Sequence, residues 1–340
     1  LALGAVLTAS AFAATTSNVM SKKALVNKGI TSFQKTDGFS AAFNSEAQFK
    51  PTSYQIPSYT MKNLNGTVSY GLGNGVAVLG NFALENDFVA QGGNSNKYNY
   101  FLADSIGTGI QYTTKDNYQF GANLNYNYWN QYNLSKDIAE SGMIKANEVT
   151  IMPYFQKNFG ANSLYVETAY SQIIMKDLKH ATMAYINPQF NHMMSNNLTL
   201  GFAGTWQVAT DNYDIASNFL NQGNNDMFQI QPFIVTYNMP EIQGLTLSLT
   251  PQVTWNNYKK NNQVGGTMDG YKTGKEPFYT NFQITPELQY TYTVNNNFNV
   301  YGYTKAEIST NLNKPSSMAS DTNNATQYNG YVGLGMNMTF

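Results

Sequence analysis

Apolar and polar residues alternate one by one along the end of the chain. From Tyr328 to Phe340, every even position is apolar or glycine, and the odd positions are mostly polar. Because successive side chains of a β-strand point to opposite faces, this order predicts a strand with one apolar and one polar face. A helix would repeat its apolar residues about every three to four positions, so the pattern argues against a helix here.

The same alternation recurs along most of the chain, most clearly in Tyr118 to Tyr128, Leu245 to Trp255 and Phe278 to Val294. Phe278 to Val294 is long enough to cross a bilayer at a tilt. Collecting these segments predicts about fourteen strands. They lie near residues 38–49, 59–72, 75–86, 99–113, 118–130, 147–158, 163–175, 181–192, 197–209, 226–238, 244–257, 278–294, 297–310 and 326–340.

The predicted connections alternate between short and long. The short ones, such as Gly73-Asn74 and Asn295-Asn296, carry the glycine and asparagine that tight turns favour. Short turns on one side and long loops on the other are typical of a membrane-spanning, antiparallel, up-and-down β-barrel. We therefore predict an all-β fold of about fourteen strands, with both termini on the side of the short turns.

Composition agrees with strands whose second face is wet but carries little charge. The chain is 42% hydrophobic, only 11% charged and has a formal net charge of -1, and it contains lysine but no arginine. This balance gives no reason to expect a nucleic-acid partner. Cysteine is absent, which removes disulfides and thiol chemistry. No phosphate-binding glycine loop or metal-ligand spacing occurs, so we expect no cofactor and no metal.

The terminal strand also carries a sorting pattern. Gly335, Met336, Met338 and Phe340 stand where the C-terminal assembly signal of Gram-negative outer-membrane β-barrels has its residues. The chain therefore resembles outer-membrane porins as a class. The resemblance implies an outer-membrane location with periplasmic termini, and the barrel assembly machinery, outer-membrane lipid and lipopolysaccharide as partners. A homo-oligomer is a further expectation.

The beginning of the chain predicts export. Residues 1–13 are short and apolar and close on Ala11-Phe12-Ala13, the pattern of a signal-peptidase site, so they are interpreted as the remnant of a signal peptide. Residues 14–37 match no strand. We interpret them as a periplasmic leader, with a plug inside the lumen as the alternative, and 38–340 as the barrel.

With the apolar face outward, the opposite parity gives the candidate pore-lining residues. Acids outnumber bases among the charged ones, which predicts a weak cation preference. Tyrosines such as Tyr154 and Tyr237 are also predicted to point inward, where they would either brace the wall or stack on sugar rings. The candidates are Glu46, Lys50, Glu85, Glu167, Glu287, Lys305, Glu307, Tyr185, Tyr279, Tyr301 and Tyr303.

Aromatic and proline positions add two further expectations. Trp129, Trp206 and Trp255 lie near the loop ends of outward-running strands, where they would form an aromatic girdle at the outer interface. Five prolines lie inside predicted strands, and proline cannot donate to a ladder of hydrogen bonds, so we expect bulges or turn-proximal positions there. They are Pro153, Pro188, Pro232, Pro251 and Pro286.

The predicted function is a porin that forms a water-filled channel for passive diffusion of small hydrophilic solutes and ions. The alternatives are a saccharide-preferring channel lined by Tyr and Asn, a transporter of hydrophobic compounds, and an adhesin-like barrel. We predict no enzymatic activity and no catalytic residue. The only histidines are His180 and His192, and neither lies in a constellation specific to catalysis.

Overall fold

The computed structural model of the 340-residue chain describes residues 37–53, 58–90, 98–133, 144–175, 181–209, 226–257, 278–313 and 326–340. The predicted signal peptide and leader lie outside them, apart from Asp37. No helix within the described ranges is both long and apolar enough to span a bilayer.

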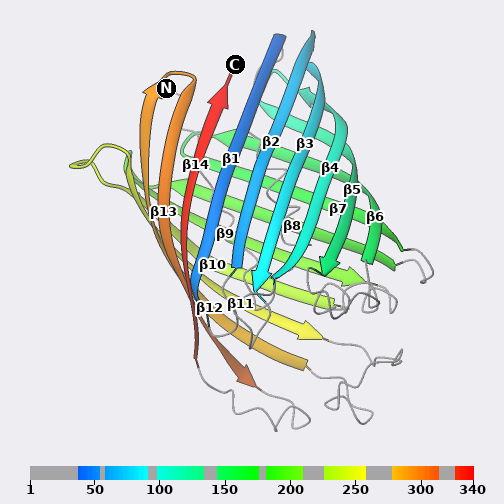
Figure 1. Cartoon of the computed structure of the whole chain (residues 1–340). Helices are drawn as coiled ribbons and strands as arrows, with labels where there is room; N and C mark the ends of the chain where they lie inside the picture. Colours follow the sequence, from blue (N-terminus) through cyan, green and yellow to red (C-terminus); the bar gives the residue numbers. More distant parts are fainter. Residues whose placement is uncertain are drawn as a thin grey trace.

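Fourteen antiparallel strands form one closed barrel, as the alternation predicts. Each strand pairs with its neighbours in sequence, and β14 also pairs with β1, so Figure 1 shows the red β14 beside the blue β1. The strands are β1 (Asp37–Ser53), β2 (Ser58–Gly73), β3 (Val76–Ala90), β4 (Tyr98–Thr113), β5 (Tyr118–Asn133), β6 (Ile144–Phe159), β7 (Asn162–Met175), β8 (Ala181–Met193), β9 (Leu198–Ala209), β10 (Asp226–Asn238), β11 (Leu245–Asn257), β12 (Phe278–Asn295), β13 (Phe298–Asn313) and β14 (Gln327–Thr339).

Alternate residues along each strand form the two faces of the barrel wall. Large apolar side chains are exposed on the outer face, which is the arrangement that a lipid-facing surface requires. Residues of the other parity are buried and mostly polar. Examples on the outer face are Phe39, Leu72, Ile106, Ile110, Phe120, Leu124, Ile151, Phe202 and Leu334.

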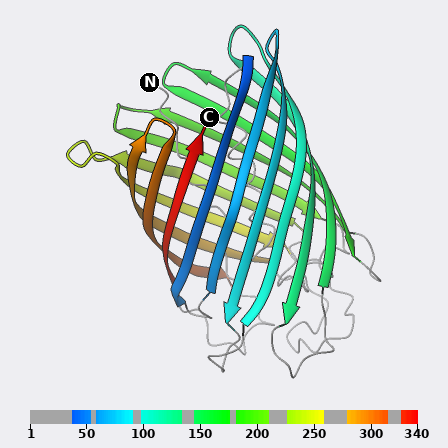
Figure 2. The same cartoon turned by 45° about the horizontal axis from the view of Figure 1, so that its top comes forward.

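The short turns lie together at one rim. The start of β1 and the end of β14 lie at the same rim (Figures 1 and 2). The turn between β2 and β3 is Asn74-Gly75 rather than the predicted Gly73-Asn74, with φ angles of 54° and 81°. Positive φ at both central positions is what a tight hairpin turn needs, and Asn-Gly is the pair that tolerates it best.

The five prolines sit in the wall, but only one lies at the bulge we expected. Register is continuous across Pro153, Pro188 and Pro286, and across Pro251 in the pairing of β11 with β12, so the bulge that was one of our two expectations is absent at these four prolines. In an antiparallel sheet the N–H and C=O of one residue point to the same neighbour, so a proline interrupts the ladder on one side only. At Pro153 the freed carbonyl accepts a hydrogen bond of 3.4 Å from the Thr168 hydroxyl.

Pro232 and the next residue form a true bulge in β10. Ile230 pairs with Val253, but Val235 pairs with Leu249, so β10 has one residue more than β11 here. Pro232 and Phe233 are therefore both exposed on the outer face. The extra residue reverses the parity beyond it, which places Tyr237 opposite Leu247 on the outer face. The prediction that Tyr237 points inward is wrong for this reason.

Candidate functional site: the polar inner wall

The inner wall is built mainly from uncharged polar side chains. Asn, Gln, Thr and Ser of the inward parity are buried along most strands. A few apolar residues interrupt them, including a small cluster of Leu79 and Tyr154 with Tyr165 packed against it. The inward-facing charged side chains of the described part are Glu46, Glu148, Glu167, Glu287, Glu307 and Lys305.

The predicted pore-lining residues divide into two groups. Glu46, Glu167, Glu287, Lys305, Glu307, Tyr185, Tyr301 and Tyr303 all lie on the inner face. The side chains of Lys50, Glu85 and Tyr279 lie outside the described residues. The sequence prediction missed Glu148, which is fully buried and accepts a 2.8 Å hydrogen bond from the Asn127 amide. The apolar Val149 beside it, which the alternation assigns to the outer face, would have revealed its inward parity.

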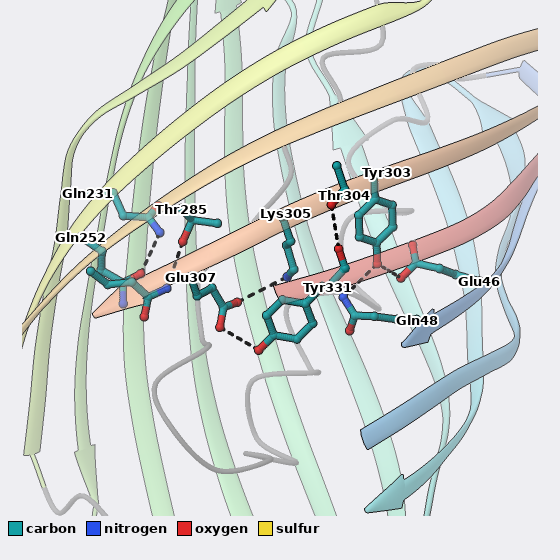
Figure 3. A network of polar contacts seen from close by, with 11 residues as sticks. Glu46, Gln48, Gln231, Gln252, Thr285, Tyr303, Thr304, Lys305, Glu307 and Tyr331 are labelled. Atoms are coloured by element: carbon teal, nitrogen blue, oxygen red, sulfur yellow. Dashed lines mark hydrogen bonds and ion pairs between the residues drawn. The ribbon is translucent and has the colours of Figure 1, made fainter. Parts of the chain in front are cut away.

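Two tyrosines of β13 share one carboxylate of β1. The Tyr301 hydroxyl donates to Glu46 Oε2 at 2.7 Å, and the Tyr303 hydroxyl donates to Glu46 Oε1 at 3.1 Å. Each hydroxyl also accepts a bond from an amide of β1, from Asn44 at 3.0 Å and from Gln48 at 2.9 Å. We call these five residues the seam cluster, because they connect β13 to β1 across the intervening β14. Figure 3 shows Tyr303 reaching both Glu46 and Gln48.

Glycines make this reach across β14 sterically feasible. Tyr301 pairs with Gly335, which pairs with Glu46, and Tyr303 pairs with Gly333, which pairs with Gln48. A Cβ on Gly335 would lie 2.3 Å from Tyr301 Cζ, and one on Gly333 would lie 2.2 Å from Tyr303 Cζ. The tips of both rings therefore lie directly on the backbone of β14, which leaves no room for a side chain.

The same three-strand row occurs on the other side of the barrel. Tyr154 of β6 pairs with Gly121 of β5, which pairs with Gln111 of β4. The Tyr154 hydroxyl donates to Gln111 Oε1 at 2.9 Å, and a Cβ on Gly121 would lie 2.2 Å from Tyr154 Cζ. A tyrosine, a glycine and an amide or carboxylate on consecutive strands thus recur as a unit of the inner wall.

Two further glutamates are held by tyrosines. Glu167 accepts bonds of 2.6 Å from both Tyr165 and Tyr185. Glu307 accepts a 2.7 Å bond from Tyr331 and lies 3.5 Å from Lys305 Nζ, which in turn lies 4.5 Å above the Tyr331 ring (Figure 3). Both carboxylates are buried, and burial of a charge is tolerable only with such partners.

The outer face carries an aromatic row at the loop end of the strands. Trp206 pairs with Phe228, which pairs with Trp255, and the last two rings stack with centroids 5.4 Å apart. Trp206 and Phe228 are exposed, so this row has the geometry expected of an interfacial girdle. The side chain of Trp129 lies outside the described residues.

The terminal strand packs its last ring against the first strand. Phe340 lies edge-on to Phe43 with centroids 6.1 Å apart, and the backbones of Phe340 and Ala41 exchange two hydrogen bonds. Met336 and Met338 face outward in the β14 pairing with β1, and Gly335 faces inward beneath Tyr301. No group of three or more His, Cys, Asp or Glu side chains within the described ranges could hold a metal ion.

Comparison with known proteins supports the fold alone. No family model and no curated protein matches the chain. CdiB from Escherichia coli aligns with a TM-score of 0.51 at 8% identity over 88% of this chain and 63% of that one. The fold is that of outer-membrane β-barrels.

Two further outer-membrane barrels align with TM-scores below 0.5. The COG4313 outer membrane channel from Pseudomonas putida F1 gives a TM-score of 0.48 at 11% identity, over 91% of this chain and 97% of that one. A FadL homologue from Pseudomonas aeruginosa gives 0.45 at 8% identity, over 88% of each chain. The chain spans only 60% of the length of CdiB from Acinetobacter baumannii.

Proposed function

We propose that this protein is an outer-membrane channel through which small hydrophilic solutes and ions diffuse passively, with a weak preference for cations. A closed wall with an apolar outer face and a mainly polar inner face supports a channel in the membrane. The polar inner face also argues against a transporter of hydrophobic compounds, which would need an apolar lumen.

The observation that carries the cation preference is the charge of the inner wall. Among the described side chains, Glu46, Glu148, Glu167, Glu287 and Glu307 face inward, against the single base Lys305. Carboxylates around a pore raise the local concentration of cations and repel anions. Glu46 and Glu287 are only partly buried and therefore act on passing ions most directly.

The orientation follows the rule for outer-membrane barrels that short turns face the periplasm. On this assignment both ends of the barrel chain, Asp37 and Phe340, lie at the periplasmic rim. The Trp206, Phe228 and Trp255 row then lies at the outer interface, against lipid and lipopolysaccharide. The exposed apolar residues around Phe340 are the surface that the assembly machinery would recognise.

Reversal potentials test the proposal. Refolded protein in a planar bilayer with a KCl gradient should show stable open steps and a reversal potential that favours K⁺. The double variant Glu46→Gln, Glu287→Gln should reduce that preference, whereas Glu241→Gln, in the exposed turn between β10 and β11, should leave it unchanged. Anion selectivity of the wild type would overturn the cation preference, and absence of conductance would overturn the channel.

A further inference from the structure

Tyr301 and Tyr303 form a flat aromatic surface on the inner wall. Their ring centroids are 6.4 Å apart and their planes differ by 18°. Because the two residues lie on the same face of β13 and both ring tips rest on the glycines of β14, the rings lie side by side along the wall. The ring tips lie over the inner side of these glycines, so ring surface is directed toward the interior of the barrel.

This surface differs from the related row around Tyr154. Tyr154 also lies on a glycine, but it is only 5% exposed, and Tyr165 packs against it with centroids 6.2 Å apart. Tyr301 and Tyr303 remain partly exposed. Tyr154 therefore has the geometry of a wall brace, while the β13 pair keeps ring surface that can be contacted from the interior.

Polar groups border the aromatic surface on the side of β1. Glu46 holds both hydroxyls, and Asn44 and Gln48 donate to them. These bonds fix the orientation of the rings before any solute arrives, so no conformational freedom of the rings is lost on binding. A carboxylate and two amides also offer acceptors and donors at the edge of the rings.

We propose that Tyr301, Tyr303, Glu46 and Gln48 form a saccharide subsite on the channel wall, in which two consecutive pyranose rings stack on the two tyrosines. Sugars present an apolar C–H face and a rim of hydroxyls, which matches an aromatic plane bordered by carboxylate and amide groups. This proposal rests on the proposed channel, because the solute reaches the subsite by entering the lumen.

Binding in detergent tests the subsite independently of conductance. Refolded protein would be titrated with maltohexaose by isothermal titration calorimetry, with sorbitol as a polyol that has no ring to stack. The wild type should bind maltohexaose and not sorbitol. The double variant Tyr301→Leu, Tyr303→Leu should bind on the order of tenfold more weakly, since two stacking contacts are lost.

The matched control is Tyr154→Leu, which removes a tyrosine from the same kind of row but from a buried position, and its affinity should equal that of the wild type. If the double variant does not fold, Tyr303→Leu alone should weaken binding measurably. A wild type that conducts ions but binds no maltohexaose would overturn the subsite and leave the channel standing. Binding of maltohexaose without conductance would overturn the channel and leave the subsite standing. Unchanged affinity in the tyrosine variants would also overturn the subsite.

Discussion

At the scale of single residues, the inner wall depends on pairing between tyrosine hydroxyls and carboxylates. Glu46, Glu167 and Glu307 each accept at least one such bond. Hydrogen bonds to a charged group contribute about 1.5–3 kcal/mol each, roughly twice a neutral one. The glycines beneath the rings matter equally, because they determine which acceptor a tyrosine can reach.

Replacement of Gly121 by alanine tests this steric role. The new Cβ would lie 2.2 Å from Tyr154 Cζ, and the buried ring would have to leave Gln111. We expect the free energy of unfolding in urea to fall by about 1–3 kcal/mol, the usual range for overpacking. Adding Tyr154→Leu should recover part of the loss. Gly204→Ala is the control, because its nearest atom would lie 3.5 Å away, and equal stability of the two alanine variants would contradict the steric explanation.

At the scale of the strands, alternation is robust only while the register is unbroken. The bulge at Pro232 and Phe233 accommodates one extra residue in β10. The residues beyond it therefore pair with β11 on matching faces. Without that residue the strand would alternate regularly, with the flanking residues still on their present faces. The bulge is therefore a local insertion that the rest of the barrel does not depend on.

Deletion of Phe233 should consequently be tolerated. Gln231 and Ile234 would keep their inward direction, and the pairing with β9 and β11 would become continuous. Deletion of Leu249, in the paired part of β11, should prevent folding, because it turns one half of that strand inside out. Heat-modifiable mobility on SDS gels measures the folded fraction. Loss of the folded band on deletion of Phe233 would show that the bulge is essential.

The strands, their approximate ends and the faces of most residues could be predicted from the sequence, because the alternation of apolar and polar residues is a local property of each strand. The inward direction predicted for Tyr237 was wrong, since nothing in the sequence marks which proline in a strand carries a bulge. The contact between Glu46 and Tyr301 could not be predicted either, because it depends on the register between the first and last strands, which only the closed barrel defines. The inward direction of Glu148 could have been predicted, since the residues beside Glu148 determine which face it lies on.

At the scale of the whole molecule, the barrel is closed by the pairing of its first strand, β1, with its last strand, β14. Ala42 lies opposite Thr339 in the register of β1 and β14. The neighbouring pair, Ala41 and Phe340, exchanges both backbone hydrogen bonds, so Ala42 and Thr339 form a closer, non-hydrogen-bonded pair.

An engineered disulfide should therefore form across the β1–β14 junction. The chain contains no cysteine, so the double variant Ala42→Cys, Thr339→Cys should form an intramolecular disulfide when the folded protein is oxidised, detectable by mass spectrometry after proteolysis. Ala42→Cys with Asn337→Cys, which is two residues out of register, should form it much less readily because the Cβ atoms are too far apart. Equal yields from the two variants would argue against the register.

The shared carboxylate of Glu46 has a consequence for the order in which the chain is made. Its partner Tyr301 follows it by 255 residues, so β1 leaves the ribosome long before either tyrosine exists. A chain that stops short of β13 lacks both hydroxyl donors, so its Glu46 carboxylate would have neither of these bonds. The two bonds of Glu46 therefore form only after nearly all of the barrel sequence has been made, where the oldest and newest strands of the polypeptide meet.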